Sequence, residues 1–317
     1  MSTFEVRVAA KVCEAEGICS YELVRLDGGA LPPFEAGAHI DVHIGDSYVR
    51  QYSLCNAPHE TRRYLIGVLR DAGSRGGSLA MHDAVHAGSV LTIGAPRNHF
   101  PLVDAVHTLL IAGGIGVTPI LAMAEALASK GAAFEMHYCA RSPQHAAFRD
   151  RIAASGFCQQ VHFHYDNGSA AQKLDLPTLL AAPLDQHLYV CGPAGFIDYV
   201  LASARAHGWP DAQLHVEYFA GAIVDTAGDQ PFDVKLASTG QLLTVPAGRS
   251  VIQVLAEQGI EVPYSCEEGV CGTCLTRVLD GVPDHRDLYL TDEEHAANDQ
   301  FTPCCSRART KLLVLDL

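Results

Sequence analysis

One stretch of the chain reads Cys266-Glu267-Glu268-Gly269-Val270-Cys271-Gly272-Thr273-Cys274. A fourth cysteine, Cys304, follows after 29 intervening residues. The two glycines between the cysteines can adopt positive φ, which lets a short loop fold tightly around its own thiols. The stretch therefore predicts a compact loop whose three thiols meet a fourth thiol from a distant part of the chain.

This C-x4-C-x2-C spacing with a distant fourth cysteine is the plant-type pattern for a [2Fe–2S] cluster. Zinc is an alternative metal, but zinc sites usually combine two C-x2-C pairs and the chain has one. A second alternative is that the cysteines are free and buried. Cys304 has a neighbouring cysteine, Cys305, and the spacing favours Cys304 as ligand with Cys305 packed behind it. The predicted metal ligands are Cys266, Cys271, Cys274 and Cys304.

The amino-acid composition limits which classes of protein the chain can belong to. The chain has 317 residues, 48% hydrophobic residues, 18% charged residues and a net charge of -14. These values exclude a disordered or collagen-like chain and suggest two or three domains. The acidity argues against a nucleic-acid partner. We see no secretory signal and no apolar run of the roughly 18 residues that a membrane span needs, so we expect a cytoplasmic protein with reduced thiols.

The pattern of short elements predicts three domains. Residues 1–104 contain short alternating strands and turns, as in an antiparallel β-barrel, with one helix over 78–85. Residues 105–220 begin with an apolar run at 108–112 and alternate strand with helix, as in an open parallel α/β sheet. Residues 221–230 suit a linker, and 231–317 form the cysteine-bearing domain. The further elements expected are strands at 134–139, 161–165, 187–190 and 214–216, helices at 118–129, 146–153, 196–206 and 250–258, and a hairpin of 232–237 with 242–245.

The barrel carries two segments that suit a flavin. Arg50, Tyr52 and Ser53 close one predicted strand, and an arginine fork suits a phosphate while an aromatic ring and a hydroxyl suit a flavin. Downstream, Arg70 precedes a glycine-rich turn that opens the predicted helix, where backbone N–H groups can meet a phosphate. An ordinary turn is the alternative for this second segment. Its predicted binding residues are Arg70, Gly76, Gly77 and Ser78.

Three strand ends in the α/β domain predict a nucleotide crevice. A glycine-rich turn follows the first buried strand, where nucleotides bind in such sheets, although it is not the G-x-G-x-x-G fingerprint. Two more predicted strands end at Arg141 and at Cys191. The alternative interpretation of the glycine-rich turn is a simple tight turn between strand and helix. Phe219 follows the last strand and either covers a flavin or fills core. The residues predicted here are Gly113, Gly114, Gly116, Thr118, Arg141, Cys191, Gly192, Pro193 and Phe219.

Taken in this order, these motifs resemble the phthalate dioxygenase reductase family over the whole chain, and the stretch 284–287 and the tail 312–317 are most similar to its vanillate O-demethylase reductases. The resemblance implies a flavin barrel, an NAD domain and a β-grasp ferredoxin domain. It implies FMN held by Arg50, Tyr52 and Ser53, with Thr118 at the ring edge and Phe219 on its face. Ser53, Cys191 and Phe219 are then the residues expected around hydride transfer.

The resemblance also implies an activity. NADH delivers a hydride and a [2Fe–2S] cluster accepts single electrons, so FMN must connect them. The expected acceptor is the Rieske centre of a separate ring-hydroxylating or O-demethylating oxygenase of aromatic catabolism, and we expect a monomer. Alternatives are a cytochrome P450 or diiron hydroxylase as acceptor, NADPH as donor, and a non-enzymatic Fe–S redox sensor. A sensor needs neither the flavin nor the nicotinamide motif.

Overall fold

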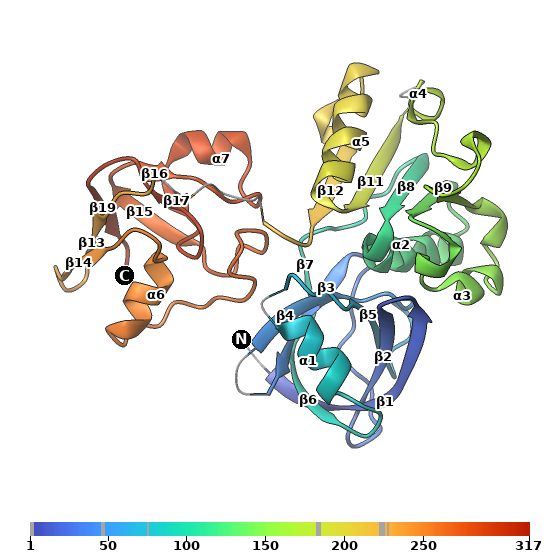
Figure 1. The fold of residues 1–317 in the computed structure, drawn as a ribbon, viewed down its shortest axis with the longest axis horizontal. Coiled ribbons are helices and arrows are strands. Elements are labelled where there is room, and N and C mark those ends of the chain that lie inside the picture. Colours follow the sequence, from blue (N-terminus) through green and yellow to red (C-terminus); the bar gives the residue numbers. More distant parts are fainter. Residues whose placement is uncertain (1–2, 46–47, 75, 182–184, 222–225, 227) are drawn as a thin grey trace. The chain divides into compact units, whose positions relative to one another are not determined.

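The computed structural model describes residues 3–45, 48–74, 76–181, 185–221, 226 and 228–317. The chain divides into two compact units, Met1–Glu217 and Tyr218–Leu317 (Figure 1). The first unit contains the predicted flavin barrel and the predicted NAD domain up to Glu217. In the predicted linker 221–230, residues 222–225 and 227 lie outside the described residues. The boundaries at 104, 220 and 230 stay predictions.

The first part of unit one is the expected antiparallel barrel. Its strands are β1 Thr3–Ala15, β2 Ile18–Arg25, β3 Ala38–Ile44, β4 Tyr48–Ser53, β5 Tyr64–Leu69, β6 Val90–Gly94 and β7 Arg97–Asn98. Six strands follow the order β4-β3-β6-β1-β2-β5, and β7 pairs with β3. A single antiparallel bridge between Leu54 and Ile66 links the end of β4 to β5 and so brings the two outer strands together. Helix α1, Gly77–Ala84, occupies the predicted helical segment.

The second part of unit one is the α/β sheet. Its strands are β8 His107–Gly113, β9 Phe134–Ala140, β10 Val161–Tyr165, β11 Gln186–Gly192 and β12 Leu214–Tyr218, and its helices are α2 Val117–Lys130, α3 Arg149–Ala153, α4 Leu176–Leu179 and α5 Ala194–Ala206. The strand order is β10-β9-β8-β11-β12. The pairs β9–β10, β8–β9 and β8–β11 are parallel. Because the chain moves outward from β8 to β10 and then returns to β11 on the other side of β8, the carboxyl ends of β8 and β11 form a switch point, where ligands bind in such sheets.

One predicted helix is shorter than expected. The sequence predicts a helix over 146–153, but α3 begins only at Arg149. Phe148 has a φ of 60° and is 1% exposed. The N–H of Ala147 donates to the hydroxyl of Tyr138 over 2.9 Å instead of to a helical carbonyl. The helix therefore starts late because Phe148 turns into the core with a left-handed backbone, which a continuous helix does not allow.

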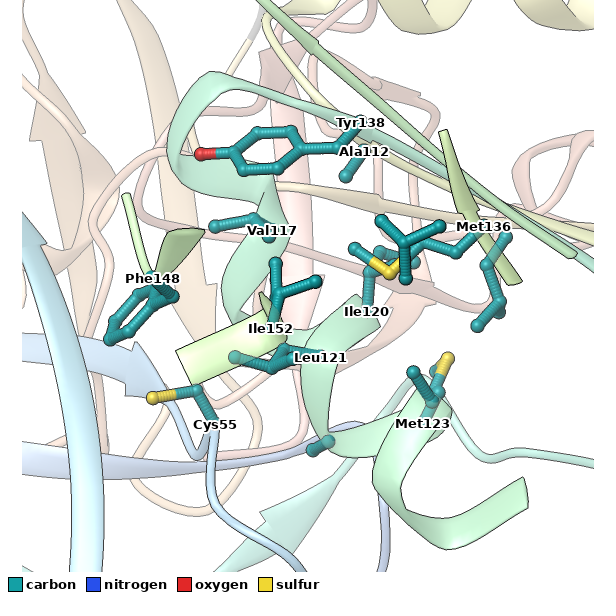
Figure 2. Close-up of a cluster of buried hydrophobic side chains, with 14 of the residues drawn as sticks. Cys55, Ala112, Val117, Ile120, Leu121, Met123, Met136, Tyr138, Phe148 and Ile152 are labelled. Atoms are coloured by element: carbon teal, nitrogen blue, oxygen red, sulfur yellow. The ribbon is translucent and has the colours of Figure 1, made fainter. Parts of the chain in front are cut away.

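The hydrophobic core of the sheet in unit one extends into the barrel, which also has a buried cluster of its own. Cys55, after the barrel strand β4, and Leu65 of β5 belong to the same buried cluster as Leu121 of α2 and Phe148. Figure 2 shows Cys55 close to the side chains of α2 and α3. At Gly67 of β5, an added Cβ would lie 2.8 Å from the methyl group of Thr118 and 3.1 Å from the ring of Phe148. This close packing holds the end of β4 and the start of α2 in one body.

Unit two is a mixed sheet covered by a helix. Its strands are β13 Phe232–Leu236, β14 Leu242–Val245, β15 Thr276–Asp280, β16 Pro283–Asp284, β17 Gln300–Phe301, β18 Arg307–Ala308 and β19 Leu312–Leu315, and its helices are α6 Val251–Glu257 and α7 Asp292–Ala297. The main order is β14-β13-β19-β15-β17, with β13 antiparallel to β14 and parallel to β19. This is the expected β-grasp arrangement. Ser250 caps α6 as predicted, in a capping box with Gln253.

None of the described helices combines the length and the apolar character that a membrane span requires.

Candidate functional site

The four predicted ligand thiols meet in unit two. Cys271, Cys274 and Cys304 are buried, and Cys266 is partly buried. Contact with Cys271 and then Cys304 lowers the pKa of Cys266, whereas contact with Cys266 raises the pKa of Cys271 and of Cys304. Cys304 also contacts Cys274. The packing thus brings together a set of soft sulfur ligands of the kind that iron–sulfur clusters use.

The backbone of the cysteine loop explains why it can wrap so tightly. Gly269 and Gly272 have φ values of 73° and 63°, and Glu267 also has a positive φ of 57°. The N–H of Glu268 donates to the sulfur of Cys266 over 3.4 Å. Backbone donors of this kind stabilise negative charge on the sulfurs. A Cβ on Gly272 would overlap the ring of Tyr289, so only glycine fits there.

The neighbouring cysteine has a different environment. The thiol of Cys305 lies 3.3 Å from the hydroxyl of Thr302 and 3.9 Å from that of Ser306, and it also contacts Cys304. A Cβ on Gly269 would lie 2.5 Å from the Cys305 sulfur. Cys305 is therefore packed between the cysteine loop and polar side chains, which favours Cys304 as the fourth ligand. The donor set fits a [2Fe–2S] cluster held by Cys266, Cys271, Cys274 and Cys304.

In unit one, Arg50 packs against the start of α1. Its guanidinium lies over the ring of Tyr48, 5.4 Å from the centroid, and a Cβ on Gly77 would lie 2.7 Å from its side chain. The first turn of α1 has no side-chain cap and no acidic residue, and Gly76 before it has a φ of 90°. Unblocked helical N–H groups beside an arginine suit a phosphate. Ser78 is at the same turn, with its hydroxyl 2.9 Å from that of Ser74. The arrangement fits the phosphate of a flavin mononucleotide.

Arg70, a predicted flavin-binding residue, pairs with a carboxylate of the protein. Its guanidinium makes an ion pair of 2.5 Å with Asp83 of α1 and is exposed. It is thus held on the surface of the helix it was predicted to precede. Its role in flavin binding stays a prediction, with this ion pair as a competing use.

Ser53, Cys191 and Glu217 come together from three different strands. The hydroxyl of Ser53, at the end of β4, donates to a carboxyl oxygen of Glu217 in β12 over 3.3 Å. Burial raises the pKa of Glu217 to about 8, although the Ser53 hydrogen bond opposes the shift. Burial, and then Glu217, raises the pKa of the fully buried thiol of Cys191. Tyr52, one residue before Ser53, is partly buried against the barrel core, and burial raises the pKa of its hydroxyl.

Sequence reasoning missed Glu217 as a candidate site residue. It stands at the carboxyl end of the last strand of the sheet, directly before two aromatic residues. A charged residue at a strand end next to a nucleotide crevice is a signal that the sequence contained. The contact with Ser53, 164 positions earlier in the chain, could be found only in the folded structure.

The glycines at the switch point have two different roles. A Cβ on Gly116 would overlap the carbonyl of Cys191, and one on Gly192 would lie 3.0 Å from the Cα of Gly113. These three glycines therefore allow two chain segments to approach each other. Gly114 has a φ of 55°, and nothing lies within 4 Å of its added Cβ. Gly114 is the position of the loop that leaves room for a ligand.

The remaining predicted residues are placed as follows. Thr118 is buried, and its hydroxyl donates to the carbonyl of Ile115 over 3.1 Å. Arg141 and Pro193 are exposed at the carboxyl ends of β9 and β11. Phe219 belongs to the second unit and is 38% exposed. The contact of Phe219 with a flavin ring stays a prediction.

Two protein-family models match parts of the chain. Residues 234–309 match a 2Fe-2S iron-sulfur cluster binding domain. Residues 99–214 match the N-terminal domain of dimethylamine monooxygenase subunit DmmA-like proteins. The first match contains all four predicted cluster ligands, and the second contains the switch point of the α/β sheet.

The chain also has full-length relatives. Vanillate O-demethylase oxidoreductase of Pseudomonas putida is 56% identical over 98% of both chains. Among solved structures, phthalate dioxygenase reductase, described as a modular structure for electron transfer from pyridine nucleotides to [2Fe-2S], is 38% identical with a TM-score of 0.79, covering 100% of this chain and 98% of that one. An intact type IV self-sufficient cytochrome P450 monooxygenase is 39% identical with a TM-score of 0.86, covering 99% of this chain and 41% of that one. The resemblance inferred from the motifs is confirmed: the chain belongs to the phthalate dioxygenase reductase family of oxidoreductases.

Proposed function

We propose that the chain is the reductase component of a two-component oxygenase and passes electrons from NADH through FMN and a [2Fe–2S] cluster to the oxygenase. The similarity to vanillate O-demethylase oxidoreductase over 98% of both chains carries this proposal. We further propose that the acceptor is the Rieske centre of an oxygenase that hydroxylates or O-demethylates an aromatic compound. The monomeric state and the cytoplasmic location stay predictions.

Unit one has residues for both reactants of the first electron transfer, the flavin and the nicotinamide dinucleotide. Arg50 and the uncapped start of α1 hold the flavin phosphate, while Ser53 lies at the end of the same barrel strand. Gly114 opens the loop at the carboxyl end of β8, where the dinucleotide lies in a sheet of this kind. FMN supplies the conversion between a hydride and single electrons. The chain supplies orientation and electrostatics.

We propose a further role for the contact between Ser53 and Glu217. Because burial raises the pKa of Glu217 to about 8, this carboxyl group is mostly protonated at neutral pH. It can therefore hold a proton next to the Ser53 hydroxyl without placing a negative charge in the crevice. We propose that the pair orients the reacting ring and keeps charge away from it.

The proposal is tested with purified holoprotein, NADH and the separately purified oxygenase component of a vanillate O-demethylase. We expect vanillate-dependent NADH oxidation with release of one formaldehyde per NADH, and no formaldehyde when either protein is omitted. Flavin released by heat should migrate as FMN on chromatography. FAD as the main flavin, or an iron–sulfur signal that NADH does not reduce, would contradict the proposed electron path.

A cytochrome P450 acceptor is the second candidate, because the chain matches part of a self-sufficient P450 monooxygenase at 39% identity. In that protein, the matched region is 41% of one longer chain. Parallel reactions with a Rieske oxygenase and with a P450 at equal concentration separate the two. Faster transfer to the P450 haem would replace the Rieske assignment and leave the reductase function intact.

A further inference from the structure

A second group of metal-binding side chains lies in unit two, apart from the four cysteines. It consists of His285 and Asp287, in the segment after β16, and His295 on α7. One ligand atom from each of the three residues lies within 4.8 Å of the other two. None of these residues belongs to the flavin, nicotinamide or cluster sites described above.

The spacing of the three side chains suits one small ion. His285 Nδ1 lies 3.8 Å from Asp287 Oδ1, and His295 Nε2 lies 3.3 Å from Asp287 Oδ2. With metal–ligand bonds of about 2.0–2.1 Å, tetrahedral zinc separates its ligand atoms by roughly 3.3 Å. The two imidazole rings stack at 4.4 Å with 27° between their planes.

The burial of His285 points to a missing partner. Its side chain is 7% exposed, and both ring nitrogens lack a hydrogen-bond partner among the described residues. Asn298 approaches the ring without reaching hydrogen-bond geometry. Leaving a buried polar group unsatisfied costs about 1–3 kcal/mol.

Asp287 is already fixed in the orientation that a metal ligand needs. Its carboxylate is fully buried and accepts the N–H groups of Tyr289 over 3.2 Å and Leu290 over 2.8 Å. The hydroxyl of Ser306 donates to the other oxygen over 3.4 Å. Supporting hydrogen bonds of this kind orient metal-binding carboxylates. The remaining ligand, His295, stands on a helix that Thr291 and Glu294 fix through a capping box.

We propose that His285, Asp287 and His295 bind one divalent transition-metal ion, with zinc as the best match to two imidazoles and a carboxylate. The ion satisfies His285 and offsets the charge of the buried Asp287. It also joins α7 to the segment after β16. That segment contacts the cysteine loop, because the N–H of Leu288 donates to the carbonyl of Gly269 over 3.0 Å. The ion therefore stabilises the segment after β16, against which the cysteine loop packs.

Unit one provides matched controls. His137 and His162 both lie beside Glu135, with Nε2–Oε1 distances of 3.2 and 3.1 Å, but His162 is half exposed. His187 and His215 stack at 5.0 Å, like the proposed pair, but their nitrogens hydrogen-bond each other over 2.7 Å. Substitution of His162 or His187 by Gln removes a clustered histidine without touching the proposed site.

The holoprotein is dialysed against buffered Zn²⁺, and zinc and iron are measured per chain. We expect one zinc beyond the cluster iron in the wild type and in the His187→Gln and His162→Gln variants. His285→Gln and His295→Gln should each weaken zinc binding by at least about 100-fold, more than the loss of a supporting hydrogen bond produces. Asp287→Asn keeps acceptors for Tyr289 and Leu290 and should also weaken binding. The visible spectrum of the cluster verifies folding in every variant.

Thermal unfolding gives a second measurement that does not depend on electron transfer. Zinc should raise the unfolding temperature of the wild type and of His187→Gln, and should leave that of His295→Gln unchanged. No zinc uptake by the wild type would overturn the proposal and leave a buried water as the partner of His285. Zinc uptake that survives in His285→Gln or disappears in His162→Gln would overturn it as well.

Discussion

Unit two takes three of its four ligand thiols from nine consecutive residues, whereas unit one takes Ser53, Cys191 and Glu217 from three strands far apart in sequence. In unit two, positive-φ residues shape a loop around its own side chains. In unit one, a core shared by the barrel and the sheet brings the strand ends together. A local site depends on the identity of a few residues, while a dispersed site depends on packing across the whole unit. The following predictions test this difference.

The largest effect is expected at the local site. Cys304→Ser should abolish the cluster, because Cys304 contacts Cys266 and Cys274, whereas Cys305→Ser should retain it, because Cys305 packs against Thr302 and Ser306. Iron content and the visible spectrum of the two purified variants provide the measurement. Loss of iron from Cys305→Ser with a normal cluster in Cys304→Ser would reverse the ligand assignment.

The next effect concerns the segment that leads into unit two. Asp229 is 4% exposed and makes ion pairs with Arg286 at 2.6 Å and with Arg307 at 3.3 Å. Arg286→Ala should lower the free energy of unfolding by about 1.5–3 kcal/mol, because the Asp229 carboxylate loses its main partner and keeps only Arg307. The hydrogen bond from Arg286 lowers the pKa of Asp229, so this difference should shrink as acid protonates the carboxylate.

Urea unfolding of this variant is compared with that of Arg309→Ala. Arg309 makes a longer contact of 3.6 Å with Asp284 and is 69% exposed, so its loss should change stability by less than about 1 kcal/mol. Equal effects of the two substitutions would show that Asp229 does not depend on Arg286.

At the dispersed site, two glycines of one loop should respond differently. Gly116→Ala should lower the free energy of unfolding by about 1–3 kcal/mol, because the new methyl group meets the carbonyl of Cys191. Gly114→Ala should cost about 1 kcal/mol through its positive φ, and it should raise the KM for NADH because its methyl group enters the open side of the loop. Urea unfolding and steady-state NADH oxidation separate the two effects. An unchanged KM in Gly114→Ala would remove this position from the nucleotide site.

The last prediction is a pH dependence from Glu217. Its pKa rises from an ordinary value of 4.5 to about 8 in the folded chain, so the folded state holds a proton that the unfolded chain releases. The free energy of unfolding should therefore fall as pH rises between these values. Glu217→Gln should remove that contribution and gain stability relative to the wild type from about pH 5 to about pH 9. Thermal unfolding across this range measures the difference, and parallel curves for the two proteins would exclude a shifted Glu217.

Much of the fold could be read from the chain. Apolar runs and turn residues predicted the barrel strands and the alternating elements of the sheet, because strand and helix periodicities are local properties. The helix over 146–153 was predicted too long, since no local signal shows that Phe148 enters the core with a left-handed backbone. Strands β15 and β19 were not predicted as such, because they are short and depend on pairing with distant strands.

From the sequence alone, the cluster ligands could be proposed, and the order of the modules and the family could be identified. All three depend on motif spacings along the chain. Only the tertiary structure decided that Ser53 meets Glu217, that Arg70 turns to Asp83, and that His285 lies buried beside Asp287 without a hydrogen-bond partner among the described residues. The physical reason is that such contacts join segments whose separation in space is fixed by core packing. The cost of burying a polar group can be assigned only when its surroundings are known.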